Sequence, residues 1–159
     1  MIGNFPFPQV FNPGGYRTFS FIPYNEVQTF PMIKNGAALL PVGLAPLSSW
    51  RKGYSTYQTL QFNEEQDSIE AGNFYKPILS GFLPGNSIEI INLITLMEAQ
   101  RYFLVQAVDA RGMTVLVGTP GSPLIFTAKF SSGQNRSDAR GYSFQFTGTT
   151  LNRAPTYPF

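Results

Sequence analysis

The densest group of carboxylates in this sequence lies between positions 64 and 70. It comprises Glu64, Glu65, Asp67 and Glu70. Paired carboxylates can hydrolyse glycosidic bonds, and carboxylate oxygens bind hard cations such as Ca²⁺. The spacing matches no established metal-binding loop, so we interpret the group as a solvated loop that follows Phe62. A carboxylate hydrolase centred on these residues is a third hypothesis, behind the two developed below.

A second candidate for chemistry is the tetrapeptide Asp-Ala-Arg-Gly, which occurs at 109–112 and again at 138–141. The two copies could bind an ion or a charged partner. Turn formation explains them better, because Asp accepts backbone hydrogen bonds at the start of a turn and Gly adopts the positive φ that a hairpin needs. The second copy ends a polar loop at 131–140, which we expect to contact a partner through Asn135, Arg136 and Arg140.

Aromatic side chains next to basic ones suggest a binding surface in two places. Trp50, Tyr54 and Tyr57 lie beside Arg51 and Lys52 and could form a platform for sugars or bases. The segment 124–148 holds aromatic and basic residues typical of a sheet that binds single strands. Aromatic residues at period two are more often core residues, so binding of a carbohydrate or a single-stranded nucleic acid is the alternative hypothesis.

Composition excludes most familiar catalytic sites. The chain of 159 residues has no cysteine and no histidine, which rules out disulfides, thiolate metal sites and serine–histidine–acid triads. We predict no enzymatic activity and no cofactor. Charged residues make up 13% of the chain and aromatic residues 15%, a balance that suits a protein buried against other subunits. The net charge of +2 is too small to predict nucleic-acid binding.

The elements that would position these residues are mainly strands. We predict a mainly β, β-rich α+β domain, built as an antiparallel sandwich or a barrel-like sheet. One helix is expected near 87–100, with Asn86 as its N-cap and Glu89 as the reciprocal partner. The expected strands are 16–22, 54–63, one or two within 69–82, and a C-terminal four-stranded meander at 102–108, 113–118, 124–130 and 142–148.

Both ends of the chain are apolar and rich in proline. We therefore divide the sequence into an arm at 1–15, a single β-rich domain at 16–150 and a second arm at 151–159. Phe5, Phe7 and Phe11 in the first arm, and Tyr157 and Phe159 in the second, are candidate interaction residues because exposed aromatic side chains favour association. Each arm is expected to pack on its own domain or on a neighbouring subunit.

No targeting or membrane segment is expected from the sequence. The first residues lack the basic start and the continuous apolar core of a signal peptide, which predicts synthesis and retention in the cytosol. The most apolar stretch, 88–97, is shorter than the roughly 20 residues that span a bilayer.

Several short motifs resemble those of small proteins encoded in phages and prophages of Bacteroidetes-type bacteria. They are Trp50, Tyr54-Ser-Thr-Tyr, Gly72-Asn-Phe-Tyr before the expected strand at 78–82, Arg101-Tyr-Phe-Leu-Val, Asp109-Ala-Arg-Gly, Val117-Gly118, Pro123-Leu-Ile-Phe, Phe130-Ser-Ser-Gly, Asp138-Ala-Arg-Gly-Tyr, Phe144-Gln-Phe-Thr-Gly-Thr-Thr and Ala154-Pro-Thr-Tyr. The resemblance implies a structural component of a virion's tail, neck or connector, made in the host cytoplasm. Its implied partners are itself, as a homo-oligomer with a ring as one arrangement, and other virion proteins. This is the leading functional hypothesis.

Overall fold

The computed structural model describes residue 4 and residues 14–159, and it is mainly β with one α-helix in that part of the chain. Its elements are β1 (Tyr16–Pro23), the 3₁₀ helix η1 (Tyr24–Glu26), β2 (Val27–Thr29), β3 (Ile33–Lys34), β4 (Ala37–Ala38), β5 (Gly43–Leu44), β6 (Arg51–Lys52), β7 (Gln61–Ile69), β8 (Gly72–Pro84), α1 (Ile88–Gln100), β9 (Tyr102–Asp109), β10 (Thr114–Val117), β11 (Leu124–Ser131) and β12 (Gly141–Thr147). The predicted β-rich α+β class is confirmed.

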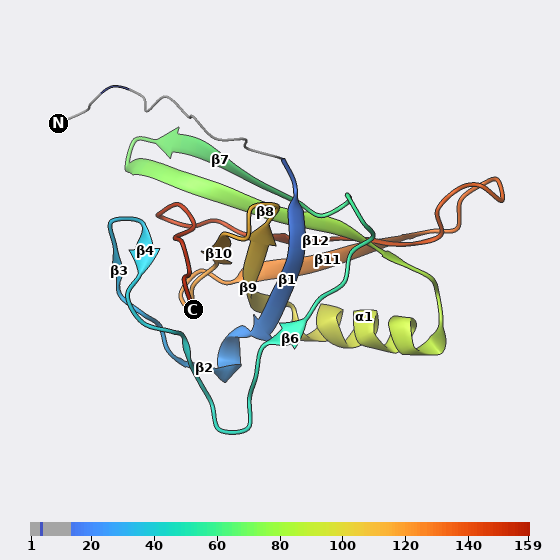
Figure 1. Ribbon diagram of the computed structural model, residues 1–159, viewed down its shortest axis with the longest axis horizontal. Coiled ribbons are helices and arrows are strands. Elements are labelled where there is room, and N and C mark those ends of the chain that lie inside the picture. The colour runs from blue at the N-terminus through green and yellow to red at the C-terminus, as the bar shows by residue number, and fades with distance from the viewer. Residues whose placement is uncertain (1–3, 5–13) are drawn as a thin grey trace.

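The main sheet is antiparallel and its two ends approach each other. The strand order is β6-β1-β9-β11-β12-β8-β7, and β10 pairs with β9. The amide of Tyr16 in β1 donates to the carbonyl of Leu60, just before β7, at 3.3 Å. The rings of Tyr16 and Phe62 are 5.7 Å apart between centroids. Because β1 contacts the start of β7, the last strand of this order, the sheet is barrel-like, with α1 lying along one side of it (Figure 1).

The segment between β6 and β7 connects the two ends of the sheet. The amide of Gly53 donates to the carbonyl of Phe19 in β1 at 2.9 Å, and the amide of Thr56 donates to the carbonyl of Phe82 in β8 at 2.9 Å. A Cβ atom at Gly53 would collide with the ring of Phe19, so the close approach requires glycine here. The segment 53–60 therefore bridges β1 and β8.

The interior is filled by aromatic rings spaced two residues apart. Phe19 and Phe21 in β1 face Phe144 and Phe146 in β12, as the alternating pattern of 142–148 predicts. The buried members of this core are Phe19, Phe21, Leu60, Leu79, Ile94, Met97, Phe103, Val105, Ala107, Val117, Leu124, Phe126, Phe144 and Phe146. Two of them, Ile94 and Met97, come from α1, which fixes the helix against the sheet.

The predicted helix is confirmed, but its cap is one residue later than expected. The side chain of Ser87 accepts a hydrogen bond from the amide of Ile90 at 3.3 Å. Asn86 is instead engaged by the hydroxyl of Tyr142, which donates to its Oδ1 atom at 3.2 Å. This tertiary contact takes Asn86 away from the helix terminus, and Ser, an equally good capping residue, takes its place.

The four strands predicted for the C-terminal half are present, yet they do not form a simple meander. Strands β10 and β11 both pair with β9, at 105–108 and at 102–103 respectively, and do not pair with each other. The chain turns between them at Thr119–Ser122, after Gly118 with φ +87°. This turn redirects the chain along β9 rather than folding it back on β10.

The prediction of a strand at 54–63 and an acidic loop after it is wrong in its boundaries. Strand β7 begins at Gln61 and continues to Ile69, so the carboxylates lie within a strand. The reason is β8, which offers backbone partners as far as the pair Ile69–Gly72. Pro77 lies inside β8, where its carbonyl faces Gly148, beyond the end of β12. Its missing N–H therefore removes no bond from the β8–β12 ladder.

The C-terminal segment lies on its own domain as an extra strand. Thr156 exchanges backbone hydrogen bonds with the β3–β4 hairpin, with Ala38 N to Thr156 O at 2.9 Å. On the other side, the amide of Leu116 in β10 donates to Pro155 O at 3.0 Å, and Tyr157 N donates to Thr114 O at 2.8 Å. The segment thus joins β4 to β10. The arm predicted at 1–15 falls mostly outside the described residues.

Candidate interaction surface

Strand β7 separates the acidic residues instead of gathering them. Successive side chains of a strand point to opposite faces, so Glu64 and Glu65 diverge. Glu64 accepts from the amide of Ala154 at 2.8 Å and pairs with Arg153 at 3.2 Å. Asp67 pairs with Lys76 at 3.4 Å. Among the described residues, no three His, Cys, Asp or Glu side chains form a group that could hold a metal ion.

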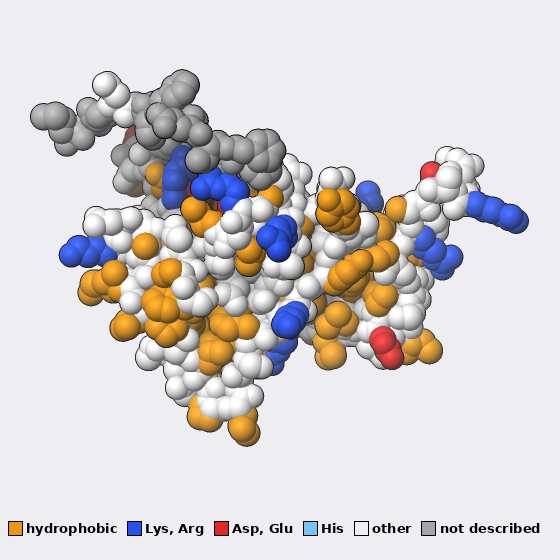
Figure 2. Space-filling model, in the orientation of Figure 1, with side chains coloured by type: hydrophobic (Ala, Val, Ile, Leu, Met, Phe, Trp, Pro, Cys, Tyr) orange, Lys and Arg blue, Asp and Glu red, His pale blue; other side chains and the backbone are white. Residues whose placement is uncertain are grey.

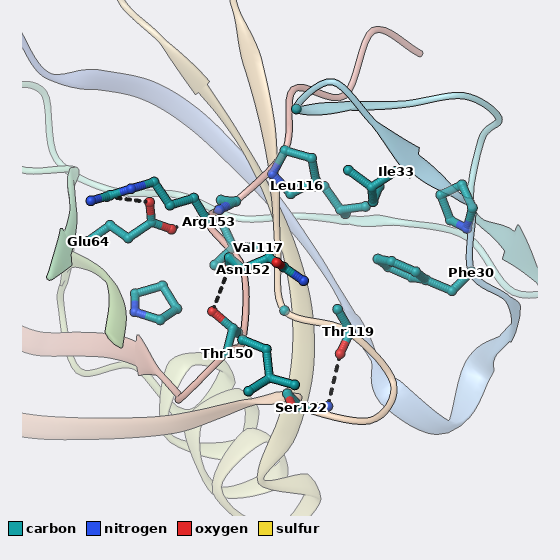
Figure 3. A pocket seen from close by; sticks show the side chains of 17 residues that line it. Phe30, Ile33, Glu64, Leu116, Val117, Thr119, Ser122, Thr150, Asn152 and Arg153 are labelled. Atoms are coloured by element: carbon teal, nitrogen blue, oxygen red, sulfur yellow. Dashed lines mark hydrogen bonds and ion pairs between the residues drawn. The ribbon is translucent and has the colours of Figure 1, made fainter. Parts of the chain in front are cut away.

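A cavity of about 600 Å³ lies where the C-terminal segment crosses between β3 and β10 (Figure 3). Four of its polar side chains, those of Glu64, Arg153, Thr119 and Thr150, form hydrogen bonds within the chain. Glu64 holds Arg153, Thr119 accepts from the amide of Ser122 at 3.0 Å, and Thr150 donates to Asn152 O at 2.8 Å. These bonds fix the turns around the cavity. We interpret the cavity as a packing gap between the C-terminal segment and the barrel.

A more apolar pocket of about 440 Å³ opens between α1 and β6 toward the aromatic interior. The residues that line it are Phe19, Phe21, Arg51, Lys52, Gly53, Tyr54, Leu83, Leu93, Ile94, Met97, Phe126, Phe144 and Phe146. Five of these side chains are phenylalanine rings. The charged members, Arg51 and Lys52, are exposed and belong to the rim strand β6. The pocket is therefore an apolar, ring-lined depression with a cationic edge, and we call it the α1–β6 pocket.

A bidentate ion pair fixes the rim strand β6 of the pocket. The guanidinium of Arg51 donates through Nη1 and Nη2 to the two carboxylate oxygens of Glu26. This hydrogen bonding lowers the pKa of Glu26 and, in return, raises the pKa of Arg51. Glu26 ends η1, directly after β1, so the pair ties β6 to the chain that leaves β1. The position of β6 at the mouth of the pocket is thus set by side chains as well as by its two-residue ladder with β1.

Helix α1 exposes apolar side chains on the faces that do not touch the core. Ile88 is 77% exposed and Leu96 is 68% exposed, and Ile91 and Leu93 are exposed as well. A surface helix ordinarily carries polar residues opposite its buried stripe, and an apolar helix is ordinarily covered on all sides. Figure 2 shows hydrophobic side chains gathered on this side of the molecule, and a second group over the region of β2 to β4. We call the exposed side chains of α1 the α1 face.

The β11–β12 hairpin carries the polar loop that was predicted to contact a partner. The hairpin extends away from the barrel, on the side opposite the β7–β8 ribbon (Figure 1). Asp138 accepts from the amides of Asn135 and Gln134, each at 2.9 Å, and these bonds lower its pKa. At the base of the loop the rings of Phe130 and Tyr142 are 5.2 Å apart. The guanidinium of Arg140 lies 5.8 Å from the centroid of Phe130.

Both copies of Asp-Ala-Arg-Gly act in turns, as predicted, but in different ways. Asp109 accepts from the amides of Arg111 and Met113 and closes the β9–β10 hairpin, with Gly112 at φ +89°. The second copy holds the 131–140 loop through Asp138. Its glycine, Gly141, is needed for space, because a Cβ atom there would collide with the backbone of Leu83 and Pro84.

The other residues predicted to contact partners are dispersed. Asn135, Arg136 and Arg140 are exposed in the β11–β12 loop. Trp50 packs partly buried against a second core cluster of Ala38, Val42, Leu116 and Tyr157. Tyr157 is only 4% exposed, whereas Phe159 is 56% exposed. Phe5, Phe7 and Phe11 lie outside the described residues. The structure brings Tyr54 to the α1–β6 pocket without Trp50, so the three aromatics predicted as a sugar platform are not assembled together.

Sequence reasoning missed both the α1 face and the α1–β6 pocket. A signal for the first was present, because apolar residues occur on every side of the helix rather than on one stripe. The pocket has no such signal, since it depends on how β6 and α1 pack beside the barrel.

Comparison with known proteins gives no match: no described protein family, curated protein or solved structure matches this chain. Among the described residues, no helix has the length and apolar character needed to cross a bilayer.

Proposed function

We propose that this protein is a structural subunit of a virion, in its tail, neck or connector, and that it acts by assembling with itself and with other virion proteins. The observation that carries the proposal is the α1 face. Four large apolar side chains of one helix, Ile88, Ile91, Leu93 and Leu96, are exposed in the single chain. Several large apolar side chains exposed on one helix are typical of a protein interface.

A second group of exposed apolar side chains supports assembly through more than one surface. Met32, Leu39, Leu40 and Leu47 are exposed in the segment between β2 and β6. A subunit that contacts neighbours on two different sides can form rings or stacks, because the two surfaces of a head-to-tail contact are different. The low charge of the chain, 13%, agrees with burial of much of its surface. The motif resemblance to phage-encoded proteins supplies the virion context of the proposal.

Native mass spectrometry and negative-stain microscopy of the full chain test the proposal. We expect closed or stacked assemblies of many copies. The double substitution Ile88→Lys and Leu96→Lys should leave the circular dichroism spectrum unchanged and reduce assembly, because it places charges on the α1 face. Gln66→Lys, an exposed position on β7, is the matched control and should assemble normally. A chain that stays monomeric at high concentration, and that fails to join purified tail components, contradicts the proposal.

A second candidate function is binding of single-stranded nucleic acid at the β11–β12 hairpin. The observation that favours it is the exposed ring of Phe130, which lies tilted against the ring of Tyr142 and near the guanidinium of Arg140. Bases stack on such rings while cations contact phosphates. A titration with oligonucleotides at several salt concentrations tests it, since phosphate contacts weaken as salt rises. Loss of binding in Phe130→Ala would favour this function, and no binding at low salt would remove it. A glycan array tests the carbohydrate form of the same alternative.

A further inference from the structure

We propose that two copies of the chain join by packing their α1 helices side by side and antiparallel, with Ile88 of each copy against Ala99 of the other. This inference rests on the proposed function, because it names the contact that the α1 face makes. The second group of exposed apolar side chains, between β2 and β6, would then join such pairs to one another.

The outer side of α1 has the residue spacing of a paired helix. Ile88, Asn92, Thr95 and Ala99 are all exposed, and they follow one another at intervals of four, three and four residues. This is the spacing of the a and d positions of a coiled coil, which places side chains on one side of a helix. The buried residues of the helix lie on the opposite side, against the sheet. We call the four exposed residues the α1 seam; it points away from the barrel, where a partner can approach it.

An antiparallel pair sets large side chains of the seam against small ones. When Asn92 lies beside the partner's Thr95, Ile88 of each copy lies beside the partner's Ala99, at both ends of the contact. Ile88 is 77% exposed, and the small side chain of Ala99 leaves space for it. A parallel pair would set Ile88 against Ile88 at one end and Ala99 against Ala99 at the other. The first would hold the helices apart and the second would leave a gap, whereas protein contacts are closely packed.

The polar residues of the seam can pair across the same contact. The hydroxyl of Thr95 donates to the carbonyl of Ile91 at 2.8 Å, so its oxygen still has a lone pair that can accept a hydrogen bond. The side-chain amide of the partner's Asn92 is a suitable donor. A single Asn in a helix seam fixes the register of the pair, because other registers would bury its amide without a partner.

Charge favours the antiparallel direction as well. A helix carries partial positive charge at its N-terminus and partial negative charge at its C-terminus, and an antiparallel pair places each end beside the opposite end of the partner helix. Glu89 and Glu98 are the charged residues of α1. They are nine residues apart, which is about 180° around the helix axis, so they lie on the flanks of the pair and outside the seam. Glu89 also lies at the end of the pair where the partner's Arg101, the C-cap residue, is found.

Cysteine cross-linking tests the contact and its direction, because the chain has no cysteine of its own. One full-length chain carries Ile88→Cys and another carries Ala99→Cys, both at exposed positions. The two are mixed and oxidised with diamide. We expect the mixed disulfide to exceed the product of either variant with Gln66→Cys, the control on β7, by about tenfold or more, because pairing raises the effective concentration of the two thiols. Each variant alone should cross-link at the control level, since the two copies of one position are about 16 Å apart along an antiparallel pair.

A chain that carries both Ile88→Cys and Ala99→Cys shows whether the contact is symmetric. The two cysteines cannot bridge within one helix, because eleven residues of helix span about 16 Å and a disulfide requires Cα atoms within about 7 Å of each other. We expect a covalent dimer joined by two disulfides, and no longer covalent chains, because the same surface is used by both copies. Circular dichroism checks that each variant is folded.

Other cross-linking patterns overturn the inference. An excess of each single variant's disulfide with itself over the mixed disulfide means that the helices are parallel. Covalent chains longer than a dimer mean a head-to-tail contact, and cross-linking at the control level means that the helices do not meet. If the wild-type chain forms assemblies in any of these cases, the proposed function stands with a different contact. A wild-type chain that stays monomeric in native mass spectrometry contradicts both.

Discussion

The rings of Phe19 and Phe144 lie 5.4 Å apart, although their strands β1 and β12 are not neighbours in the sheet. Two other strands, β9 and β11, separate them along the hydrogen-bonded order. The sheet must therefore curve so that its inner face meets itself. The same rings line the α1–β6 pocket, so the curvature that brings β1 and β12 together also forms the wall of this pocket.

Truncating the central ring should destabilise the fold. Phe144→Ala removes a buried ring that contacts Phe19, Phe126 and Phe146, and we expect the free energy of unfolding to fall by about 3–5 kcal/mol. Urea denaturation followed by tryptophan fluorescence measures this. Phe159→Ala is the control, because Phe159 is mostly exposed, and its effect should stay within about 1 kcal/mol. Equal losses for the two variants would contradict the assignment of Phe144 to the core.

Removing Glu64 should loosen the C-terminal segment. Glu64→Ala deletes the acceptor of the Ala154 amide and the partner of Arg153. We expect a loss of about 1–3 kcal/mol, typical of hydrogen bonds to a charged group. Hydrogen exchange should become faster at 154–157, where the segment pairs with β10. Glu65→Ala changes the neighbouring exposed carboxylate and should leave the exchange rates as they are; the same acceleration in both variants would show that Glu64 does not hold the segment.

The hydroxyl of Tyr157 should contribute to stability from within the second core. It accepts a hydrogen bond from the buried amide of Val42 at 3.0 Å. Tyr157→Phe keeps the ring and leaves that amide without its acceptor, which should cost about 1–3 kcal/mol in the free energy of unfolding. Tyr54→Phe, at an exposed position, is the matched control. If thermal unfolding of the two variants coincides, the bond to Val42 contributes nothing measurable.

The β11–β12 loop should respond to acid at an unusually low pH. Backbone hydrogen bonds lower the pKa of Asp138 in the folded protein, so the order that this carboxylate provides is complete above its ordinary pKa and is lost as pH falls through the lowered value. Amide chemical shifts of Gln134 and Asn135 should follow that titration. In Asp138→Ala the acid-dependent shift should disappear. A transition at or above the ordinary pKa of aspartate would contradict the geometry of the loop.

Local signals in the sequence were sufficient for the helix and for the C-terminal strands. The apolar recurrence at 88–97 with a capping residue before it, and the turn at 109–112, depend on neighbours within a few residues. The acidic group was misplaced because the pairing of β7 with β8 prevails over the polarity of its side chains. Beyond Glu64 the side chains of β7 are exposed on both faces, which suits polar residues.

The closure of the barrel and the α1–β6 pocket could not be predicted from the sequence. Closure depends on the contact of Tyr16 with Leu60, and the pocket on rings contributed by β1, β11 and β12 together with α1. Contacts between residues so far apart along the chain follow from packing in three dimensions. Hydrophobic periodicity reports only the local structure of a segment and does not predict such contacts. The α1 face, by contrast, has a signal in the sequence, because apolar residues occur on every side of the helix.

The mass of the full-length protein at high concentration can be measured by native mass spectrometry for the wild-type chain and for the Ile88→Lys and Leu96→Lys double variant. We expect assemblies of many copies for the wild type and a shift toward monomer for the variant, with Gln66→Lys unchanged. A wild-type chain that is monomeric throughout, or a double variant that assembles as the wild type does, would contradict the central claim that the exposed α1 face joins subunits.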